Sequence, residues 1–344
     1  LISDSSMFFV LCFILAVSLS VRVSAFTGSV AVSKKSVSLK MNVFDNFVKG
    51  FSSTTASKPT SGNLQSVAIT GATGLVGTEL CKRLAADDVK VVKLTTRSNL
   101  AMNGDNQEIV TWDPSSGALD NAEALEGVDA IIHLAGENVA TGDFSSPFTA
   151  LGAWSEGKKS KIFESRQLGT KLLVDTIKQM KKKPKVLISA SGSGVYGYSD
   201  STTVFDESNK KATSGDGFLA AVCRVWEEEA LKAQSLGVRT VCVRFPPIFS
   251  TKAGILAKLL PIFGLGAGGN LGSGDQAFSW VSLEDAIRAI EFALDNKKIS
   301  GPVNVCSPNP VTNAEFTSAM GAALNRPAVI PVPEIAVNLI FGEM

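Results

Sequence analysis

The chain has 344 residues, of which 45% are hydrophobic and 19% are charged, and its formal net charge is +1. This composition predicts a globular protein, long enough for one large α/β domain and a smaller lobe, and gives no electrostatic reason to expect nucleic acid as a partner. Five cysteines without a CxxC pair and a single histidine, His133, argue against a zinc site, so no metal is expected.

The first 64 residues differ in composition from the rest of the chain. Phe8 to Val21 is an apolar run too short to span a bilayer comfortably, and small residues follow it, so residues 1–25 are expected to be a signal peptide. Residues 26–64 are rich in serine, threonine and lysine with Asp45 as their one acid, which is typical of a transit peptide or linker. The two segments predict a plastid protein with a two-part presequence; secretion is the alternative, and no membrane span is expected in the mature protein.

A dinucleotide-binding turn follows. Ser66 to Thr70 predicts a buried strand, and a glycine-rich turn then leads into an amphipathic helix that runs to Ala86. In such a turn the first glycine allows the tight bend, the second lets the backbone approach a diphosphate, and the third lets the helix pack closely on the sheet. The predicted cofactor-binding residues of this turn are Gly71, Ala72, Thr73, Gly74, Leu75, Val76 and Gly77.

The residue at the end of the next predicted strand, Val89 to Thr95, indicates which of the two nicotinamide cofactors the protein binds. Arg97 stands at its end, about 20 positions after Gly77, where an acidic residue would bind the ribose hydroxyls of NAD. An arginine suits the 2′-phosphate of NADP instead, because a guanidinium forms charge-assisted hydrogen bonds with phosphate. The sequence therefore favours NADP(H) over NAD(H), with a solvent-exposed arginine as the plain alternative.

A third strand is expected over Asp129 to Glu137, whose apolar run fits a parallel strand buried on both faces. Small residues at its end leave room for a cofactor, so Leu134, Ala135 and Gly136 complete the predicted cofactor-binding set. His133 is expected to be a packed strand residue with a satisfied hydrogen bond, because no catalytic triad accompanies it.

The remaining chain continues the alternation of helices and strands, which predicts an α/β fold with a Rossmann-type, doubly wound parallel sheet. The expected elements are a helix over Lys158–Met180, a strand over Val186–Ala190, a helix over Phe218–Ser235, a strand over Val238–Phe245, and helices capped at Ser282 and Thr312. We expect residues 65–248 to form the NAD(P)-binding domain. Residues 249–344 are expected to form a small C-terminal substrate lobe that contains the glycine-rich loop Gly264–Gly274.

Taken together, these motifs resemble the extended short-chain dehydrogenase/reductases of the NAD-dependent epimerase/dehydratase family. The closer resemblance is to an atypical subgroup, the YfcH-like epimerase family proteins and their plant chloroplast homologues. It runs from about Val67 to Met344, and since that family continues into a further helix and tail, the chain is expected to be shortened at its C-terminus. The stretches that carry it are Trp154-Ser155-Glu156, Ser165-Arg166, Ile188–Gly197, Phe218–Glu227, Gly254–Pro261, the loop through Trp280, and Ser307–Pro310.

The main departure from the superfamily concerns catalysis. The resemblance implies a tyrosine with a lysine four residues later on one helix, where the lysine holds the nicotinamide ribose and activates the phenol. The chain contains no such pair, and its helix carries Phe218 and Val222 at the corresponding positions. Neither side chain transfers a proton, and the closer subgroup shares this absence.

The catalytic candidates are Ser193 and Tyr196, which follow the strand Val186–Ala190. They lie on the loop after the carboxyl end of that strand, where the resemblance to the superfamily implies a substrate-binding serine or threonine. A phenol ordinarily titrates near about 10 and is a poor base without a nearby cation, so Tyr196 is equally consistent with a pocket-lining or turn residue. Arg244 ends a strand on the same side, either to meet an anionic substrate or to pair with a buried acid.

Two functions remain open on these grounds. One is an NADP(H)-dependent oxidoreductase or epimerase-like enzyme that acts on a small molecule of unknown identity. The alternative is a non-catalytic regulator or scaffold that senses the cofactor in the plastid, consistent with the missing tyrosine and lysine. A fold of this kind serves both roles, and it leaves the oligomeric state open as well.

Overall fold

The computed structural model describes residues 64–97, 106–139, 154–197, 203–208 and 216–332. The predicted signal peptide and nearly all of the predicted transit segment lie outside these residues, as does the chain from 333 to 344. Within the described ranges, no helix combines the length and the apolar character needed to cross a bilayer.

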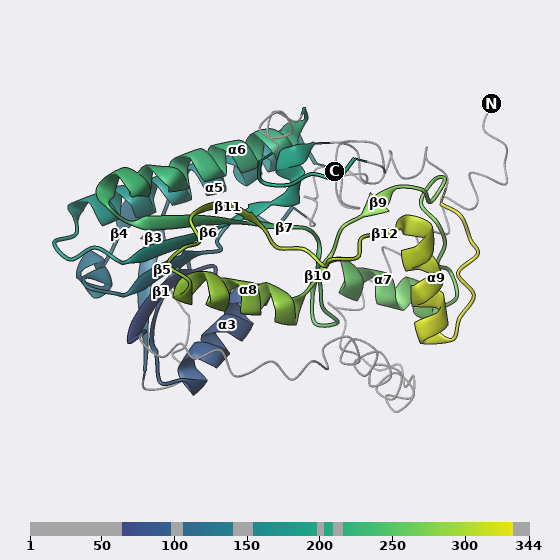
Figure 1. The fold of residues 1–344 in the computed structure, drawn as a ribbon, viewed down its shortest axis with the longest axis horizontal. Helices are drawn as coiled ribbons and strands as arrows, with labels where there is room; N and C mark the ends of the chain where they lie inside the picture. The colour runs from purple at the N-terminus through teal and green to yellow at the C-terminus, as the bar shows by residue number, and fades with distance from the viewer. Residues whose placement is uncertain (1–63, 98–105, 140–153, 198–202, 209–215, 333–344) are drawn as a thin grey trace.

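One eight-stranded sheet organises the molecule, in the order β11-β7-β6-β5-β1-β2-β3-β4 (Figure 1). All its neighbouring strands run parallel except β3 and β4. The strands are β1 (Ser66–Thr70), β2 (Lys90–Thr95), β3 (Gln107–Asp113), β4 (Ala118–Leu119), β5 (Ala130–His133), β6 (Val186–Gly192), β7 (Arg239–Phe245) and β11 (Gly301–Asn304). From β1 the chain builds outward to β2 and β3, then crosses to β5 on the other side. This reversal is the position at which doubly wound sheets bind dinucleotides.

Helices cover both faces of the sheet (Figure 1). On one face lie α5 (Glu156–Gln179) and α6 (Phe218–Leu231), and on the other lie α3 (Leu75–Ala86) and α8 (Leu283–Asp295). Alternation along β1 shows the two layers directly: Val67 and Ile69 belong to the core under α3 and α8, whereas Ala68 belongs to the core under α5. Short 3-10 helices connect these elements at η1 (Ala122–Leu125), η2 (Ser193–Tyr196) and η4 (Lys232–Leu236).

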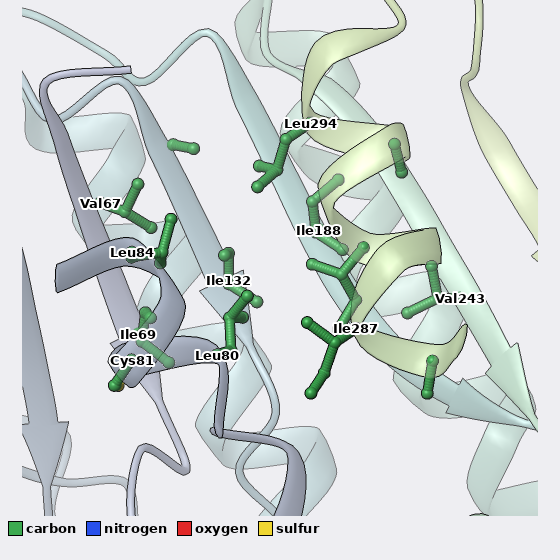
Figure 2. Packing of buried hydrophobic residues seen from close by; sticks show 14 of the residues in the cluster. Val67, Ile69, Leu80, Cys81, Leu84, Ile132, Ile188, Val243, Ile287 and Leu294 are labelled. Carbon is green, nitrogen blue, oxygen red and sulfur yellow. The ribbon is translucent and has the colours of Figure 1, made fainter. Parts of the chain in front are cut away.

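The layer under α3 and α8 shows what holds the helices in place. Leu80 and Leu84 of α3 and Ile287 of α8 are fully buried against strand residues such as Ile188 (Figure 2). Burial of one such side chain contributes about 1.5–3 kcal/mol.

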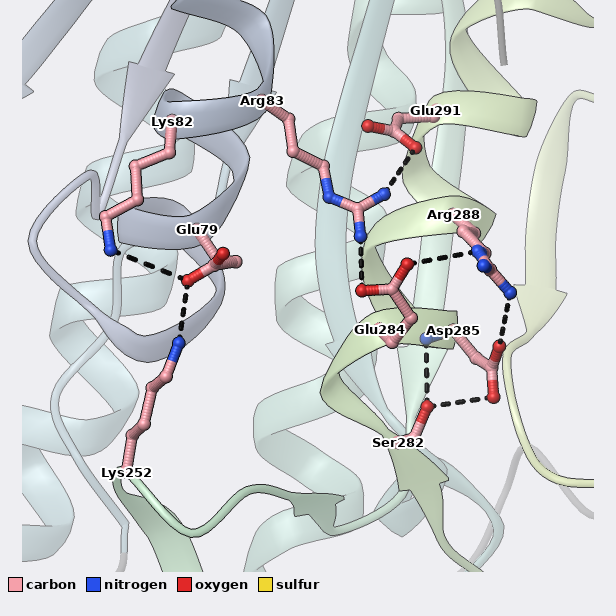
Figure 3. A network of polar contacts seen from close by, with 9 residues as sticks. All are labelled: Glu79, Lys82, Arg83, Lys252, Ser282, Glu284, Asp285, Arg288 and Glu291. Carbon is pink, nitrogen blue, oxygen red and sulfur yellow. Dashed lines mark hydrogen bonds and ion pairs between the residues drawn. The ribbon is translucent and has the colours of Figure 1, made fainter. Parts of the chain in front are cut away.

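Ion pairs flank this apolar layer (Figure 3). Arg83 of α3 pairs with Glu284 and Glu291 of α8. Glu79 of α3 pairs with Lys82 and Lys252. Pairs this exposed are worth about 0–1 kcal/mol each, so the apolar contacts dominate.

A smaller lobe lies beyond the carboxyl ends of the strands (Figure 1). Its core joins Leu256 and Phe263 of α7 to Phe316 and Met320 of α9. Its elements are α7 (Gly254–Gly264), α9 (Asn313–Leu324), the parallel pair β8 (Ile248–Phe249) and β10 (Val281–Ser282), and the antiparallel pair β9 (Ala277–Phe278) and β12 (Val311–Thr312).

The expected lobe from residue 249 onward is interrupted in the structure. Helix α8 packs on the main sheet, and β11 pairs with β7 over Val241–Arg244, so the chain returns to the large domain before entering the lobe again. The two helix starts expected at Ser282 and Thr312 are present. Thr312 and Glu315 form a complete capping box, and the Ser282 hydroxyl accepts from the Asp285 backbone.

Candidate functional site

The glycine turn between β1 and α3 has a backbone that only glycine accommodates. Gly71 has φ +68°, and a Cβ there would lie 2.8 Å from the carbonyl carbon of Leu134. A Cβ on Gly77 would lie 2.3 Å from the Gly71 oxygen. Gly74 donates its N–H to that same oxygen at 2.9 Å and is the N-cap of α3. The turn therefore presents the N-terminus of α3, a favourable place for a diphosphate.

The ends of β1 and β5 are tied together beside this turn. Thr70 Oγ1 accepts from the backbone N–H of Leu134 at 3.1 Å and of Ala135 at 3.2 Å. As a result, the predicted cofactor residues after β5 lie against the predicted glycine turn, although more than 60 positions separate them in the chain. A Cβ on Gly136 would approach the Arg166 guanidinium to 3.0 Å, so this segment also fits closely on α5.

His133 is a structural residue, as its sequence context predicts. It is fully buried, and its two ring nitrogens bond Thr70 Oγ1 at 2.7 Å and Thr170 Oγ1 at 3.0 Å. Burial, with a smaller contribution from the charge of Arg166, lowers the pKa of His133 to about 3. An imidazole in this state is neutral at physiological pH and is enclosed by protein.

Arg97 lies at the carboxyl end of β2, on the opposite side of β1 from β5. Its side chain is exposed, and its backbone N–H donates to Thr95 Oγ1 at 3.0 Å. Within the part of the chain that the structure describes, no hydrogen bond or ion pair engages the guanidinium, so it can meet a ligand that extends from the glycine turn toward β2.

The other candidate residues follow β6. Ser193 begins η2 and is partly exposed, whereas Tyr196 ends η2 and is buried. The Tyr196 hydroxyl donates to Asn304 Oδ1 at 2.8 Å and accepts from Arg244 at 2.9 Å. Both hydrogen-bonding functions of this phenol are thus used within the protein.

Arg244 pairs with a buried acid, the second of its two expected roles. Its Nε and NH2 groups donate to the Glu227 carboxylate at 2.8 and 2.7 Å, and both side chains are buried. Burial alone would lower the pKa of Arg244, but the hydrogen bonds and charge of Glu227 raise it above its ordinary value. Ser191 also donates to Glu227, at 2.7 Å.

This pairing corrects one premise about Tyr196. The sequence showed no cation near it, but the Arg244 guanidinium lies both at its hydroxyl and 5.2 Å from its ring centroid. The two residues are 48 positions apart, and only the pairing of β6 with β7 brings them together.

At the start of α6, hydrocarbon occupies the positions where the superfamily has tyrosine and lysine. Phe218 packs against Trp154 with ring centroids 5.5 Å apart, and the Lys159 ammonium lies 6.0 Å from the Phe218 ring. Val222 is buried. The first turns of α5 and α6 therefore meet here.

A further pair at this end of the sheet was missed by the sequence analysis. Glu137 directly follows Gly136, and its carboxylate contacts the ammonium of Lys158 in the first turn of α5. The Lys158 side chain is only 4% exposed, and the Glu137 side chain is 38% exposed. An acid at the end of the predicted cofactor strand Asp129–Glu137 was a signal available in the sequence.

Comparison with known proteins places these features in a family. The model of the NAD dependent epimerase/dehydratase family matches residues 67–306. An epimerase family protein of Mycobacterium bovis is 39% identical over 277 residues, covering 80% of this chain and 85% of that protein. The chloroplastic epimerase family protein SDR39U1 homolog of Arabidopsis thaliana is 36% identical over 284 residues, covering 80% of this chain and 76% of its own.

Among solved structures, the human epimerase family protein SDR39U1 with NADPH is similar, with a TM-score of 0.67 and 29% identity. The match covers 80% of this chain and 86% of the human one. A nucleoside-diphosphate sugar epimerase from Corynebacterium glutamicum has a TM-score of 0.61 and 28% identity, and covers 82% of this chain and 59% of that chain.

Proposed function

The chain belongs to the NAD-dependent epimerase/dehydratase family, and we propose that it is an NADP(H)-binding oxidoreductase or epimerase-like enzyme acting on a small molecule. The observation that carries this proposal is the glycine turn packed against the end of β5, with an exposed arginine across the switch point. The cofactor diphosphate would lie at the N-terminus of α3, where free amide groups and the helix dipole favour negative charge.

Arg97 supports NADP(H) over NAD(H). The adenosine half of the cofactor would lie toward β2, where an exposed guanidinium suits a 2′-phosphate. The human relative was solved with NADPH, which agrees with this choice.

We propose Ser193 as the residue that contacts the substrate, with Tyr196 holding the turn in place. The Ser193 side chain is partly exposed on the loop after β6, whereas the Tyr196 hydroxyl is engaged with Asn304 and Arg244. The smaller lobe, at the carboxyl ends of the strands, would close over the substrate.

A spectrophotometric screen tests the proposed enzyme activity. The purified protein, with NADPH, is incubated with a panel of aldehydes, ketones and nucleotide sugars, and absorbance at the NADPH band is followed. We expect NADPH to be oxidised in the presence of at least one class of carbonyl compound. Ser193→Ala should lose at least tenfold in turnover and keep its affinity for NADPH. Full turnover in Ser193→Ala would remove this residue from the mechanism.

The non-catalytic alternative has one observation in its favour. Phe218 and Val222 supply no proton-transferring group at the two positions of α6 where the superfamily has tyrosine and lysine. A protein that binds NADPH tightly but oxidises none of it across the panel would support a cofactor-sensing regulator or scaffold.

We also propose a plastid location. The composition of the first 64 residues and the chloroplastic relative in Arabidopsis thaliana support it. Residues 1–64 fused to a fluorescent protein should direct it to the plastid of an alga with secondary plastids. Delivery to the secretory pathway would instead support the alternative.

A further inference from the structure

The sheet determines where the two halves of a bound dinucleotide would lie. Strand order reverses between β1 and β5, and dinucleotides lie across such a switch point. With the diphosphate at the start of α3 and the adenosine half toward Arg97, the nicotinamide half extends over the ends of β5 and β6. Its ribose needs hydrogen-bond partners at that place.

Among the described residues near these strand ends, two hydroxyl groups are already engaged within the protein. The Ser191 hydroxyl bonds Glu227, and the Tyr196 hydroxyl bonds Asn304 and Arg244. Phe218 and Val222 at the start of α6 offer only hydrocarbon. Glu137 differs, because it directly follows the predicted cofactor residues Leu134–Gly136 and its side chain stays 38% exposed although its carboxylate contacts the Lys158 ammonium.

Three contacts fix Glu137 against α5. Its N–H donates to Ser165 Oγ at 2.9 Å, its carbonyl accepts from Arg166 at 3.1 Å, and its carboxylate contacts the Lys158 ammonium. The Arg166 guanidinium also lies 4.8 Å from the Trp226 ring centroid, which ties this segment to α6. The carboxylate is therefore held in position before any ligand binds.

Lys158 is placed against the usual electrostatic preference. It is the third residue of α5, and the N-cap Ser155 accepts from its N–H at 3.1 Å. A helix N-terminus disfavours cations, and a buried ammonium requires an anionic neighbour. The Glu137 carboxylate is such a neighbour, so the two side chains hold each other in position at the edge of the candidate site.

We propose that the Glu137 carboxylate accepts hydrogen bonds from the hydroxyl groups of the nicotinamide ribose, and that Lys158 positions it. The inference rests on the proposed binding of NADP(H). In the superfamily the nicotinamide ribose is held from the helix that corresponds to α6, where this chain has Phe218 and Val222. Here the ribose would be held by residues after β5 and in the first turn of α5. Carboxylates are well suited to this role, since ribose hydroxyls donate to charged acceptors more strongly than to neutral ones.

Calorimetric titration of the full chain with two ligands tests the proposal. NADPH carries both riboses, whereas 2′,5′-ADP carries only the adenosine half. Glu137→Gln should raise the Kd for NADPH about tenfold and leave the Kd for 2′,5′-ADP unchanged. Glu164→Gln is the matched control, because this exposed carboxylate of α5 bonds Ser160 and should affect neither ligand.

The double variant Glu137→Gln/Lys158→Met removes the anion and the cation together. It should show the same higher Kd for NADPH and the same unchanged Kd for 2′,5′-ADP as Glu137→Gln. This result would show that the weaker NADPH binding comes from the lost ribose contact and not from an unpaired charge on Lys158. Equal weakening of both ligands in Glu137→Gln, or no weakening of NADPH, would overturn the role of Glu137. A wild-type protein that binds neither ligand would overturn the proposed cofactor itself.

Discussion

At the residue scale, the buried pair of Arg244 and Glu227 joins β7 to α6 beneath the candidate substrate loop. Through its NH1 group, Arg244 also donates to the Tyr196 hydroxyl at 2.9 Å. Pairs of this kind contribute little net stability when intact, but the loss of one partner leaves a buried charge without compensation.

We therefore expect Glu227→Gln to lower the free energy of unfolding by about 3–5 kcal/mol in urea titrations. The neighbouring Glu228 is exposed, so Glu228→Gln should stay within about 0.5 kcal/mol of the wild type. A loss below about 1 kcal/mol in Glu227→Gln would mean that the ion pair does not form in solution.

His133 predicts a specific pH dependence, since its pKa is lowered from 6.5 to about 3. The unfolded chain binds a proton on this imidazole below about pH 6.5, but the folded protein does not until about pH 3. The free energy of unfolding should therefore fall as the pH falls from 6.5, by at most about 1.4 kcal/mol per unit. His133 is the single histidine of the sequence, so His133→Asn should flatten the dependence between pH 7 and pH 5. Equal slopes in the two proteins would contradict the buried, neutral state.

Which residues belong to the site was only partly predictable from the sequence. The glycine turn and Leu134–Gly136 were predictable, because each follows a strand whose apolar run is a local signal. The structure places the two segments side by side. The partners of Arg244 and Tyr196 were not, because those contacts join segments far apart in the chain. Lys158 was missed as well, since nothing near it in sequence indicates that its ammonium is buried.

At the element scale, the turn between β1 and α3 depends on close approach of its backbone. A methyl group on Gly77 would lie 2.3 Å from the Gly71 oxygen and 2.8 Å from the Ala72 Cα, both of which are backbone atoms that cannot easily move. Gly264, the last residue of α7, has no atom within 4 Å of the corresponding position.

Gly77→Ala should therefore destabilise the protein by about 1–3 kcal/mol and weaken NADPH binding, because α3 is displaced from the turn. Gly264→Ala is the matched control and should be neutral or slightly stabilising, since alanine favours the helix. Urea unfolding and NADPH titration of both variants measure the two effects. Equal behaviour of the two variants would contradict the close packing of the turn.

Most of the elements were predictable from local periodicity, with ends that differ by a few residues. Strand β3 was missed because Gln107–Asp113 lacks a continuous apolar run and only two of its seven residues are buried. The return of α8 and β11 to the main sheet was missed for another reason. Pairing of β11 with β7 is a tertiary contact, and nothing in the Gly301–Asn304 stretch specifies its neighbour.

At the scale of the whole molecule, the switch point between β1 and β5 brings together every residue proposed to bind the cofactor. Arg97 stands on one side of it and Glu137 on the other, where Ser193, the proposed substrate contact, also lies. The proposed cofactor, a dinucleotide with a 2′-phosphate, would lie across this point.

Fluorescence titration with NADPH and NADH, on the wild type and on Arg97→Ala, tests this claim most directly. We expect tighter binding of NADPH than of NADH, and an increase of about 10- to 100-fold in the Kd for NADPH in Arg97→Ala with little change in the Kd for NADH. Arg288→Ala on α8 serves as the control, because Arg288 pairs with Glu284 away from the turn. Equal affinities for the two cofactors, or a Kd for NADPH that Arg97→Ala leaves unchanged, would contradict it.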